Sequence, residues 1–268
     1  MKQLLTFLTL GILLLSCSRN EEEIVNDQDN TPLITKMSPY GLTSENQSGL
    51  YTYFEYDNAK RLTKKSGKFI ETEIRTFYYN EIYTSLEYDK NTVTVENFTT
   101  LVGMSVPKES IYITLNKSMQ IEKKEIPNGY NNSWLRKLVY YYLNNKLVEI
   151  KTTFPNKPYA SNGPENYLLT YSEKFYYDSN GNLSKAEYFE QRNGINKGEK
   201  IVRIFENYDN SINPLKRFYL LEQYFYGSIS KNNYRKYTEI HYDEDVITTK
   251  YESNWRYLYD LNGNILVN

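Results

Sequence analysis

The chain has 268 residues, with 32 basic and 33 acidic side chains and a net charge of −1. This balance leaves no basic footprint for nucleic acid, so we expect no nucleic-acid partner. Hydrophobic residues make up 40% of the chain and the mean hydropathy is −0.69, values typical of a well-charged surface. Tyrosine is the unusual entry in the composition, at 29 residues, and tyrosine favours strands.

The first seventeen residues have the pattern of a secretion signal. Met1-Lys2 is positive, and Leu4 to Leu15 is largely apolar but too short to span a bilayer as a helix. The segment ends in Leu14-Leu15-Ser16-Cys17, which resembles the lipobox of bacterial lipoproteins. The resemblance implies a signal peptide over residues 1–16, cleavage before Cys17, and acylation of its thiol and amino group. The alternative is an ordinary secretory signal in which the single cysteine falls at this place by chance.

The residues after Cys17 predict a tether. Residues 17–35 are rich in acids and Asn and have little to bury, which is typical of a flexible linker. Ser18 replaces the Asp that retains enteric lipoproteins at the inner membrane, and Glu21-Glu22-Glu23 resembles the surface-export signal of Bacteroidetes-type lipoproteins. We therefore expect an outer-membrane, surface-exposed location. The alternative is that these acids only keep the tether solvated and extended.

Residues 36–268 show no second break in composition and are expected to form one domain. A unit recurs in it, with an aromatic strand, Tyr-Asp, a polar turn, and an aliphatic residue six places after the tyrosine. The clear copies are Tyr53 to Leu62, Phe175 to Leu183 and Tyr257 to Ile265. Degenerate copies lie at Tyr88-Asp89, Tyr142-Leu143-Asn144, Tyr208-Asp209 and Tyr242-Asp243.

The chemistry of this unit is that of a hairpin. The Asp side chain accepts backbone hydrogen bonds from the turn, and Asn-Gly supplies the positive φ that closes it. We therefore predict an all-β fold: a long antiparallel meander of hairpins that forms a curved open sheet or a soluble barrel-like structure. One short helix is expected near residues 214–226, because Asn213-Pro214 supplies a cap and a first turn and Gly227 an end.

The Tyr-Asp hairpin resembles the YD repeat of Rhs-type proteins. Combined with the lipobox, it looks like the small Bacteroidetes lipoproteins of unknown function that have a porin-like β fold. The chain is short for the Rhs shell that encloses a toxin, and Ala59 and Asp245 stand where Gly is usual. Membrane strands need an unbroken apolar face. Runs such as Leu62 to Ser66 and Ile121 to Glu125 are interrupted by Lys and Glu on both faces, so we expect a soluble domain.

Candidate catalytic and metal sites are weak in this sequence. Asp178 to Asn182 and Asp260 to Asn264 resemble the start of a calcium loop but lack its later ligands, which favours a turn. Asp243-Glu244-Asp245 beside His241, the single histidine, could hold a metal or run acid–base chemistry, yet it falls where a hairpin turn is expected. We therefore predict no catalytic residue, cofactor or metal, and Cys17 as the one modified residue.

Two hypotheses for function remain. The first is a non-enzymatic surface lipoprotein that serves in binding, adhesion or envelope scaffolding, with the membrane, a polysaccharide or envelope proteins as partners. Exposed tyrosine rings that stack on sugars would serve this role; the plainer interpretation is that tyrosine is simply a suitable strand former. The second is a polysaccharide or peptide hydrolase that uses two carboxylates in a cleft.

Overall fold

The computed structural model describes residues 31–42, 49–71, 74–104, 106, 110–127, 134–157 and 166–267. The strands are β1 (Lys36–Met37), β2 (Thr52–Tyr56), β3 (Leu62–Glu71), β4 (Thr76–Asp89), β5 (Thr92–Thr99), β6 (Ile111–Leu115), β7 (Ile121–Ile126), β8 (Arg136–Leu143), β9 (Lys146–Thr153), β10 (Leu169–Tyr177), β11 (Leu183–Arg192), β12 (Ile195–Glu206), β13 (Lys236–Asp243) and β14 (Val246–Asn254). Between β12 and β13 lies a helical segment made of η1 (Pro214–Phe218), η2 (Glu222–Tyr224) and α1 (Phe225–Ser228).

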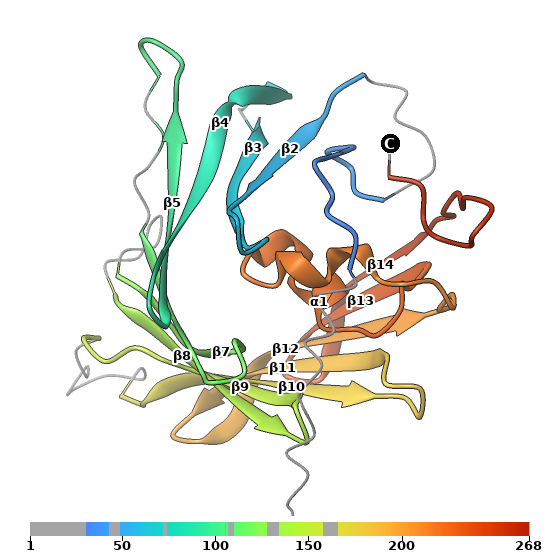
Figure 1. The fold of residues 1–268 in the computed structure, drawn as a ribbon. Coiled ribbons are helices and arrows are strands. Elements are labelled where there is room, and N and C mark those ends of the chain that lie inside the picture. The colour runs from blue at the N-terminus through green and yellow to red at the C-terminus, as the bar shows by residue number, and fades with distance from the viewer. Residues whose placement is uncertain are drawn as a thin grey trace, which may run out of the picture.

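The strands form one antiparallel sheet in which each strand pairs with the next in the chain, from β1 to β14. The sheet curls around the helical segment, so that its first and last strands approach each other (Figure 1). Within the described part of the chain β1 and β14 are not paired, and the sheet is therefore open. The prediction of an all-β antiparallel meander in a curved open sheet is confirmed.

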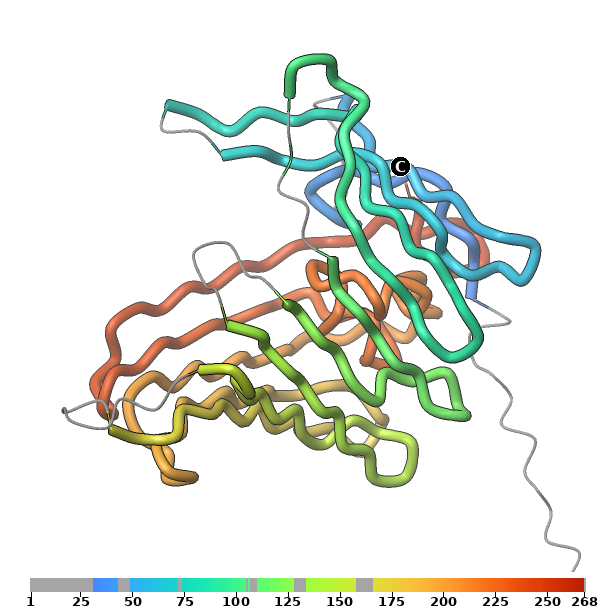
Figure 2. The backbone as a smooth tube through the Cα atoms, turned by 90° about the vertical axis from the view of Figure 1, so that its left-hand side faces the viewer, coloured from blue at the N-terminus to red at the C-terminus, as the bar shows by residue number. Residues whose placement is uncertain are grey.

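Alternating strand direction gives the sheet two rims with different contents. The turns after β2, β4, β6, β8 and β10 lie along one rim, on the right of Figure 2, and this is the turn rim. The opposite rim, where β11 turns into β12 and β13 into β14, is the loop rim. The helical segment leaves the end of β12 at the turn rim and packs over the concave face there (Figure 1).

The Tyr-Asp turns close as the sequence predicts. One oxygen of Asp178 accepts the backbone N–H groups of Asn180 and Asn182 at 2.9 and 2.8 Å, and Gly181 supplies a φ of +87°. Asp260 makes the same two bonds in the last copy. In the first copy, the position equivalent to Gly181 is Lys60, which has a φ of +59°. The departure from Gly at this turn is thus at Lys60, not at Ala59.

In four copies of the unit the tyrosine ties its strand to the preceding one, and Tyr257, two residues before the tyrosine of the last copy, does the same; we call this arrangement a tyrosine clip. Tyr142, at the end of β8, donates its hydroxyl to the carbonyl of Ile121 at the start of β7, at 2.9 Å. The other clips join Tyr56 to Ile34, Tyr88 to Leu62, Tyr208 to Leu183 and Tyr257 to Tyr234. The ring packs against the core while the hydroxyl satisfies a carbonyl at the strand end, so a residue with both properties is needed there.

Two degenerate copies of the repeat do not form a hairpin at the turn rim. Asp209 accepts hydrogen bonds from Ser211 and Asn233, at the entry and exit of the helical segment, in place of closing a two-strand turn. Tyr242-Asp243 ends β13 at the loop rim, because β13, like the other odd-numbered strands from β3 onward, runs from the turn rim to the loop rim.

The helical segment begins as predicted. Asn213 is buried, accepts the backbone N–H of Leu215 at 2.9 Å, and donates to the carbonyls of Gly227 and Ser230. The predicted helix is three short pieces, two of them 3₁₀, rather than one continuous α-helix. Phe218 is fully buried and stacks on Phe54 of β2 with ring centroids 4.3 Å apart. The segment thus fills the interior of the curled sheet.

The chain enters the fold beside this segment. Thr31 and Ile34, in the last part of the range expected to be linker, are 4% exposed, and Arg217 donates to the carbonyl of Thr31 at 3.2 Å. The expected signal peptide, the acylated Cys17 and most of the linker lie outside the described residues. No helix in the described ranges is both long enough and apolar enough to cross a membrane.

Candidate functional site: two cavities on either side of the helical segment

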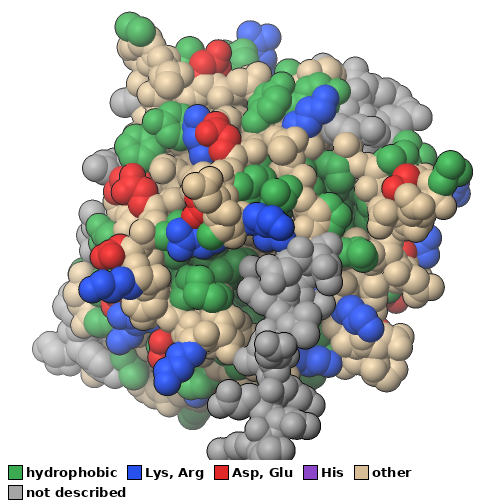
Figure 3. Space-filling view, in the orientation of Figure 1, with side chains coloured by type: hydrophobic (Ala, Val, Ile, Leu, Met, Phe, Trp, Pro, Cys, Tyr) green, Lys and Arg blue, Asp and Glu red, His purple; other side chains and the backbone are tan. Residues whose placement is uncertain are grey.

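Exposed tyrosines do not gather into one binding face. They lie on separate strands, such as Tyr53 on β2, Tyr141 on β8 and Tyr251 on β14. Two outer-face rings are partly covered, with the Lys151 and Lys185 amines 5.4 and 4.2 Å from the ring centroids of Tyr141 and Tyr176. Figure 3 shows hydrophobic side chains interspersed with acids and bases over the visible face. Among the described residues, the exposed tyrosines therefore form no continuous surface for stacking on sugars.

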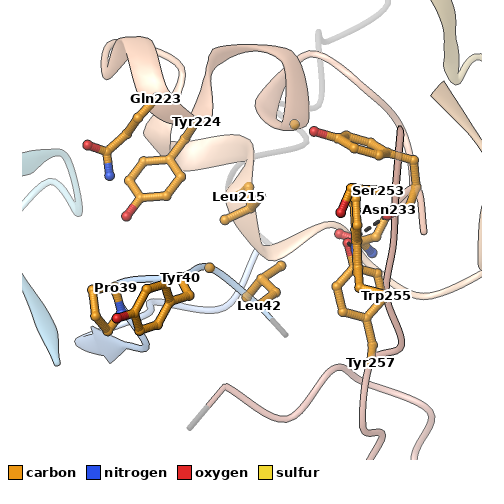
Figure 4. A pocket seen from close by; sticks show the side chains of 13 residues that line it. Pro39, Tyr40, Leu42, Leu215, Gln223, Tyr224, Asn233, Ser253, Trp255 and Tyr257 are labelled. Atoms are coloured by element: carbon orange, nitrogen blue, oxygen red, sulfur yellow. Dashed lines mark hydrogen bonds between the residues drawn. The ribbon is translucent and has the colours of Figure 1, made fainter. Parts of the chain in front are cut away.

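The first cavity lies at the seam where the two ends of the sheet approach, and we call it the seam cavity. It has a volume of about 380 Å³. Four stretches of chain line it: the residues after β1, the helical segment, the residues just before β13, and the residues around the end of β14 (Figure 4). The lining residues are Pro39, Tyr40, Gly41, Leu42, Leu215, Gln223, Tyr224, Gly227, Asn233, Tyr234, Ser253, Trp255 and Tyr257. None of these described residues carries a charge.

Among the buried side-chain polar atoms that line the seam cavity, the Tyr224 hydroxyl alone lacks a hydrogen-bond partner in the described residues. Trp255 donates its indole N–H to the Tyr257 hydroxyl, which donates to the Tyr234 carbonyl, both at 2.7 Å. Tyr224 extends from the helical segment toward Pro39 (Figure 4), and its hydroxyl is buried with no hydrogen-bond partner among the described residues. Burial raises the pKa of Tyr224, so this hydroxyl stays protonated. A buried hydroxyl without a partner costs about 1–3 kcal/mol.

The second cavity lies on the concave face toward the loop rim, and we call it the concave cavity. Its volume is about 430 Å³. Strands β8 to β12 supply its floor and walls, and Glu222 and Tyr226 of the helical segment close one side. The lining residues are Arg136, Leu138, Ile150, Thr152, Phe154, Tyr171, Glu173, Tyr188, Glu199, Ile201, Arg203, Glu222 and Tyr226. Five of the thirteen are ionisable acids or bases, in contrast to the seam cavity.

A chain of ion pairs begins at Glu173 and Arg203 in the lining of the concave cavity and continues to Glu239 and His241 on β13. Arg203 on β12 contacts Glu173 on β10 at 3.2 Å and Glu239 on β13 at 2.8 Å. Tyr226 donates its hydroxyl to the same oxygen of Glu173 at 2.6 Å, and His241 contacts Glu239 at 2.7 Å. Sheet register places these side chains together, because Arg203 lies directly opposite Glu239 in the sheet.

The two acids of this network have opposite pKa shifts. Burial raises the pKa of Glu173, and the hydrogen bond from Tyr226 and the charge of Arg203 offset only part of the rise. Glu239 is less buried, and bonds from Tyr237, His241 and Arg203 hold its pKa below the ordinary value despite some desolvation. Glu173 is therefore the carboxyl that gains a proton first as the pH falls.

On the β7–β8 side, Arg136 lines the concave cavity, and Lys124 lies diagonally beside Arg136 in the sheet but outside the lining. Lys124 is 4% exposed and Arg136, on the next strand, has a buried Nε without a hydrogen-bond partner among the described residues. Glu222 is the acid that raises the pKa of Lys124 electrostatically, but burial and the charge of Arg136 lower it overall. Within the described ranges, Lys124 and Glu222 are not within ion-pair distance of each other.

The structure separates the site residues singled out by sequence. Glu244 and Asp245 form the β13–β14 turn at the loop rim with φ values of +45° and +70°, as expected for a hairpin. His241 points instead to Glu239, which the sequence analysis did not name. Among the described residues, no group of three or more His, Cys, Asp or Glu side chains is arranged to hold a metal ion.

Sequence reasoning missed both cavities. The residues that line the concave cavity alternate along their strands, as Tyr171 and Glu173 do on β10 and Ile201 and Arg203 on β12. An inward-facing acid or base among apolar neighbours is the one signal available, and it becomes meaningful only when the strand register is known.

Comparison with known proteins gives the fold. No family model matches the chain, and no curated protein matches it. A crystal structure of a porin-like protein from Bacteroides vulgatus superposes with a TM-score of 0.51 at 12% identity, over 88% of this chain and 94% of that chain. The two chains share a fold. A porin-like protein from Bacteroides uniformis gives a TM-score of 0.49 at 12% identity, over 88% of each chain. The predicted resemblance to a porin-like β fold is thus confirmed at the level of fold.

Proposed function

We propose that this protein is a lipid-anchored envelope protein of the Bacteroidetes surface type whose folded domain binds an uncharged saccharide in the seam cavity without chemical conversion. The anchor rests on Leu14-Leu15-Ser16-Cys17, and the outward location on the acids that follow. The YD-like repeats then serve as the scaffold of the domain.

The seam cavity carries the binding part of the proposal. Its volume is in the range of small-molecule sites, and its lining is aromatic and neutral. An ionised ligand would lose its hydration there without gaining a counter-charge, which favours a neutral ligand. Tyr40, Tyr224 and Trp255 offer rings for the apolar faces of a sugar, and the Tyr224 hydroxyl gains a partner from a ligand hydroxyl.

Tyr224→Phe tests the binding role because it separates stability from binding. Removing an unpartnered buried hydroxyl should leave the free energy of unfolding unchanged or raise it by up to about 1 kcal/mol. The affinity for a neutral saccharide, taken from a calorimetric panel of maltotriose, cellotriose, mannotriose and xylotriose, should fall about tenfold. Tyr141→Phe, on the outer face, is the matched control. Absence of binding to the whole panel, or equal affinity of wild type and Tyr224→Phe, contradicts the proposal.

The anchor has its own test. Metabolic labelling with palmitate should mark the wild type and leave Cys17→Ala unlabelled, and protease added to intact cells should remove the wild-type domain. Equal labelling of the two proteins would rule out the anchor, whereas protection from protease would rule out surface exposure.

A hydrolase is the second candidate, because two carboxyls with opposite pKa shifts contact one guanidinium in the concave cavity. In this case Glu173, which gains its proton first, is the general acid. Glu173→Gln should then abolish turnover of a polysaccharide substrate. Turnover that survives this substitution removes the candidate. We favour non-catalytic binding, since Glu173 is already engaged by Tyr226 and Arg203.

A further inference from the structure

The concave cavity is separate from the seam cavity, and the helical segment divides them. Glu222 and Tyr226 face the concave cavity, whereas Gln223, Tyr224 and Gly227 face the seam. The two cavities therefore present different chemistry on opposite sides of one short segment. A ligand suited to the neutral seam cavity would not satisfy the charges of the concave cavity.

Charges in the concave cavity are unevenly compensated. Arg203 is bound by two carboxylates, Glu173 and Glu239, and its side chain is 15% exposed. The Nε of Arg136 is buried and has no hydrogen-bond partner among the described residues. A buried donor without a partner is costly, and an anion bound to the Arg136 guanidinium would offset that cost.

Lys124 adds to the positive charge beside Arg136. Ile126 pairs with Arg136 and Lys124 with Leu138, so Lys124 and Arg136 are diagonal neighbours on one face of the sheet. A guanidinium presents parallel N–H groups that match the two oxygens of a carboxylate, and a nearby ammonium strengthens the same site. The chemistry at this wall therefore fits a carboxylate.

The other lining residues indicate which further groups a ligand of this cavity would carry. Tyr171 and Tyr188 stack with centroids 5.1 Å apart, and Phe154 meets Tyr171 edge-on at 5.8 Å, which gives an aromatic wall. Glu173 and Glu199 offer acceptor oxygens. The charge of Glu173 is already balanced by Arg203, so it accepts from neutral hydroxyls in preference to a second cation. Hydroxyl groups, a ring and a carboxylate together describe an acidic sugar.

We propose that the concave cavity binds a uronic-acid saccharide, with the carboxylate on Arg136, the hydroxyls on Glu173 and Glu199, and the sugar ring against the aromatic wall. This site is independent of the seam cavity and is accessible in the same folded domain. The carboxylate ligand Arg136 belongs to β8, and the acceptors Glu173 and Glu199 belong to β10 and β12.

Calorimetry at neutral pH with trigalacturonate and with a hyaluronan tetrasaccharide tests this proposal. At least one should bind, and full methyl esterification of trigalacturonate, which removes its charge and keeps its hydroxyls, should weaken that ligand at least tenfold. Arg136→Gln should lower the affinity for the acid form at least tenfold and leave the affinity for the ester unchanged. Lys151→Gln, on the outer face of the neighbouring strand β9, is the matched control and should bind as the wild type does.

A second variant keeps the test decisive if Arg136→Gln does not fold. Glu222→Gln removes the acid beside the two cations and should raise the affinity for the acid saccharide about threefold or more. No binding of either acid saccharide, equal binding of the ester, or no change in both variants overturns the proposal. Tighter binding of a triglutamate peptide than of trigalacturonate would overturn its saccharide part.

Discussion

The turn rim and the loop rim of the sheet differ in the interactions that their side chains make. At the turn rim the same arrangement recurs: an Asx turn such as that of Asp178, and a tyrosine clip such as that of Tyr142, leave backbone groups satisfied. Toward the loop rim the inward positions differ from strand to strand. Glu173 and Arg203 form an ion pair there, while the buried Nε of Arg136 has no hydrogen-bond partner among the described residues.

This difference separates the residues that stabilise the sheet from those that line the concave cavity. Each clip contributes about 1 kcal/mol net, and several in register hold successive strands together without a disulfide. Because the Asx turn and the clip recur, they are visible in the sequence as a Tyr-Asp pattern. The half of the concave face toward the loop rim does not repeat in this way, because its inward positions carry Arg136 on β8, Glu173 on β10 and Arg203 on β12. The clips thus stabilise the sheet, while the inward side chains toward the loop rim differ from one strand to the next.

Removing the charge at the centre of the loop-rim half should have the largest effect on stability. Arg203→Met leaves Glu173 and Glu239 close together without their shared cation, which should lower the free energy of unfolding by about 3–5 kcal/mol. Urea denaturation measures the loss. Lys64→Met, which breaks the exposed pair with Glu55 on the outer face, should cost about 0–1 kcal/mol. Similar losses in the two variants would contradict a buried network.

Breaking a clip should have a smaller but clear effect. Tyr142→Phe keeps the packed ring and leaves the carbonyl of Ile121 without its donor, which should cost about 1–3 kcal/mol. Tyr141, the preceding residue, points to the outer face and is 43% exposed, so Tyr141→Phe should change stability by less than about 0.5 kcal/mol. Thermal unfolding of the two variants compares the loss of the same phenolic oxygen on the two faces of β8. Equal shifts would show that the clips do not stabilise the fold.

The sequence predicts the scaffold far better than the site. The strands, the turns at Asp178 and Asp260, and the Asn213 cap each depend on local chemistry, and local chemistry is visible in a short stretch of sequence. The clips were not predicted, because each joins a tyrosine to a carbonyl more than twenty residues away.

The cavities could not be predicted for a related reason. Arg136, Glu173 and Arg203 lie on three strands, and only the register of the curled sheet brings them to one place. The acids singled out in sequence, Asp243 to Asp245, are adjacent in the chain but occupy a turn. Polar residues that are adjacent in this sequence lie in turns. A site in a meander is instead formed by alternate residues of different strands.

The smallest expected effect is a difference in pH dependence between the two acids that share Arg203. Burial holds the pKa of Glu173 above its ordinary value of 4.5, so the native state keeps this proton after the unfolded state has lost it. Stability from this group is therefore full below pH 4.5 and declines as the pH rises through the native pKa. The free energy of unfolding of the wild type, measured from pH 4 to 7.5, should fall relative to Glu173→Gln. Glu239 has a lowered pKa, so relative to Glu239→Gln the wild type should instead gain stability as the pH rises through the same acidic range. Slopes of the same sign in both comparisons would show that the two carboxyls do not occupy different environments, and the asymmetry of the concave cavity would lose its support.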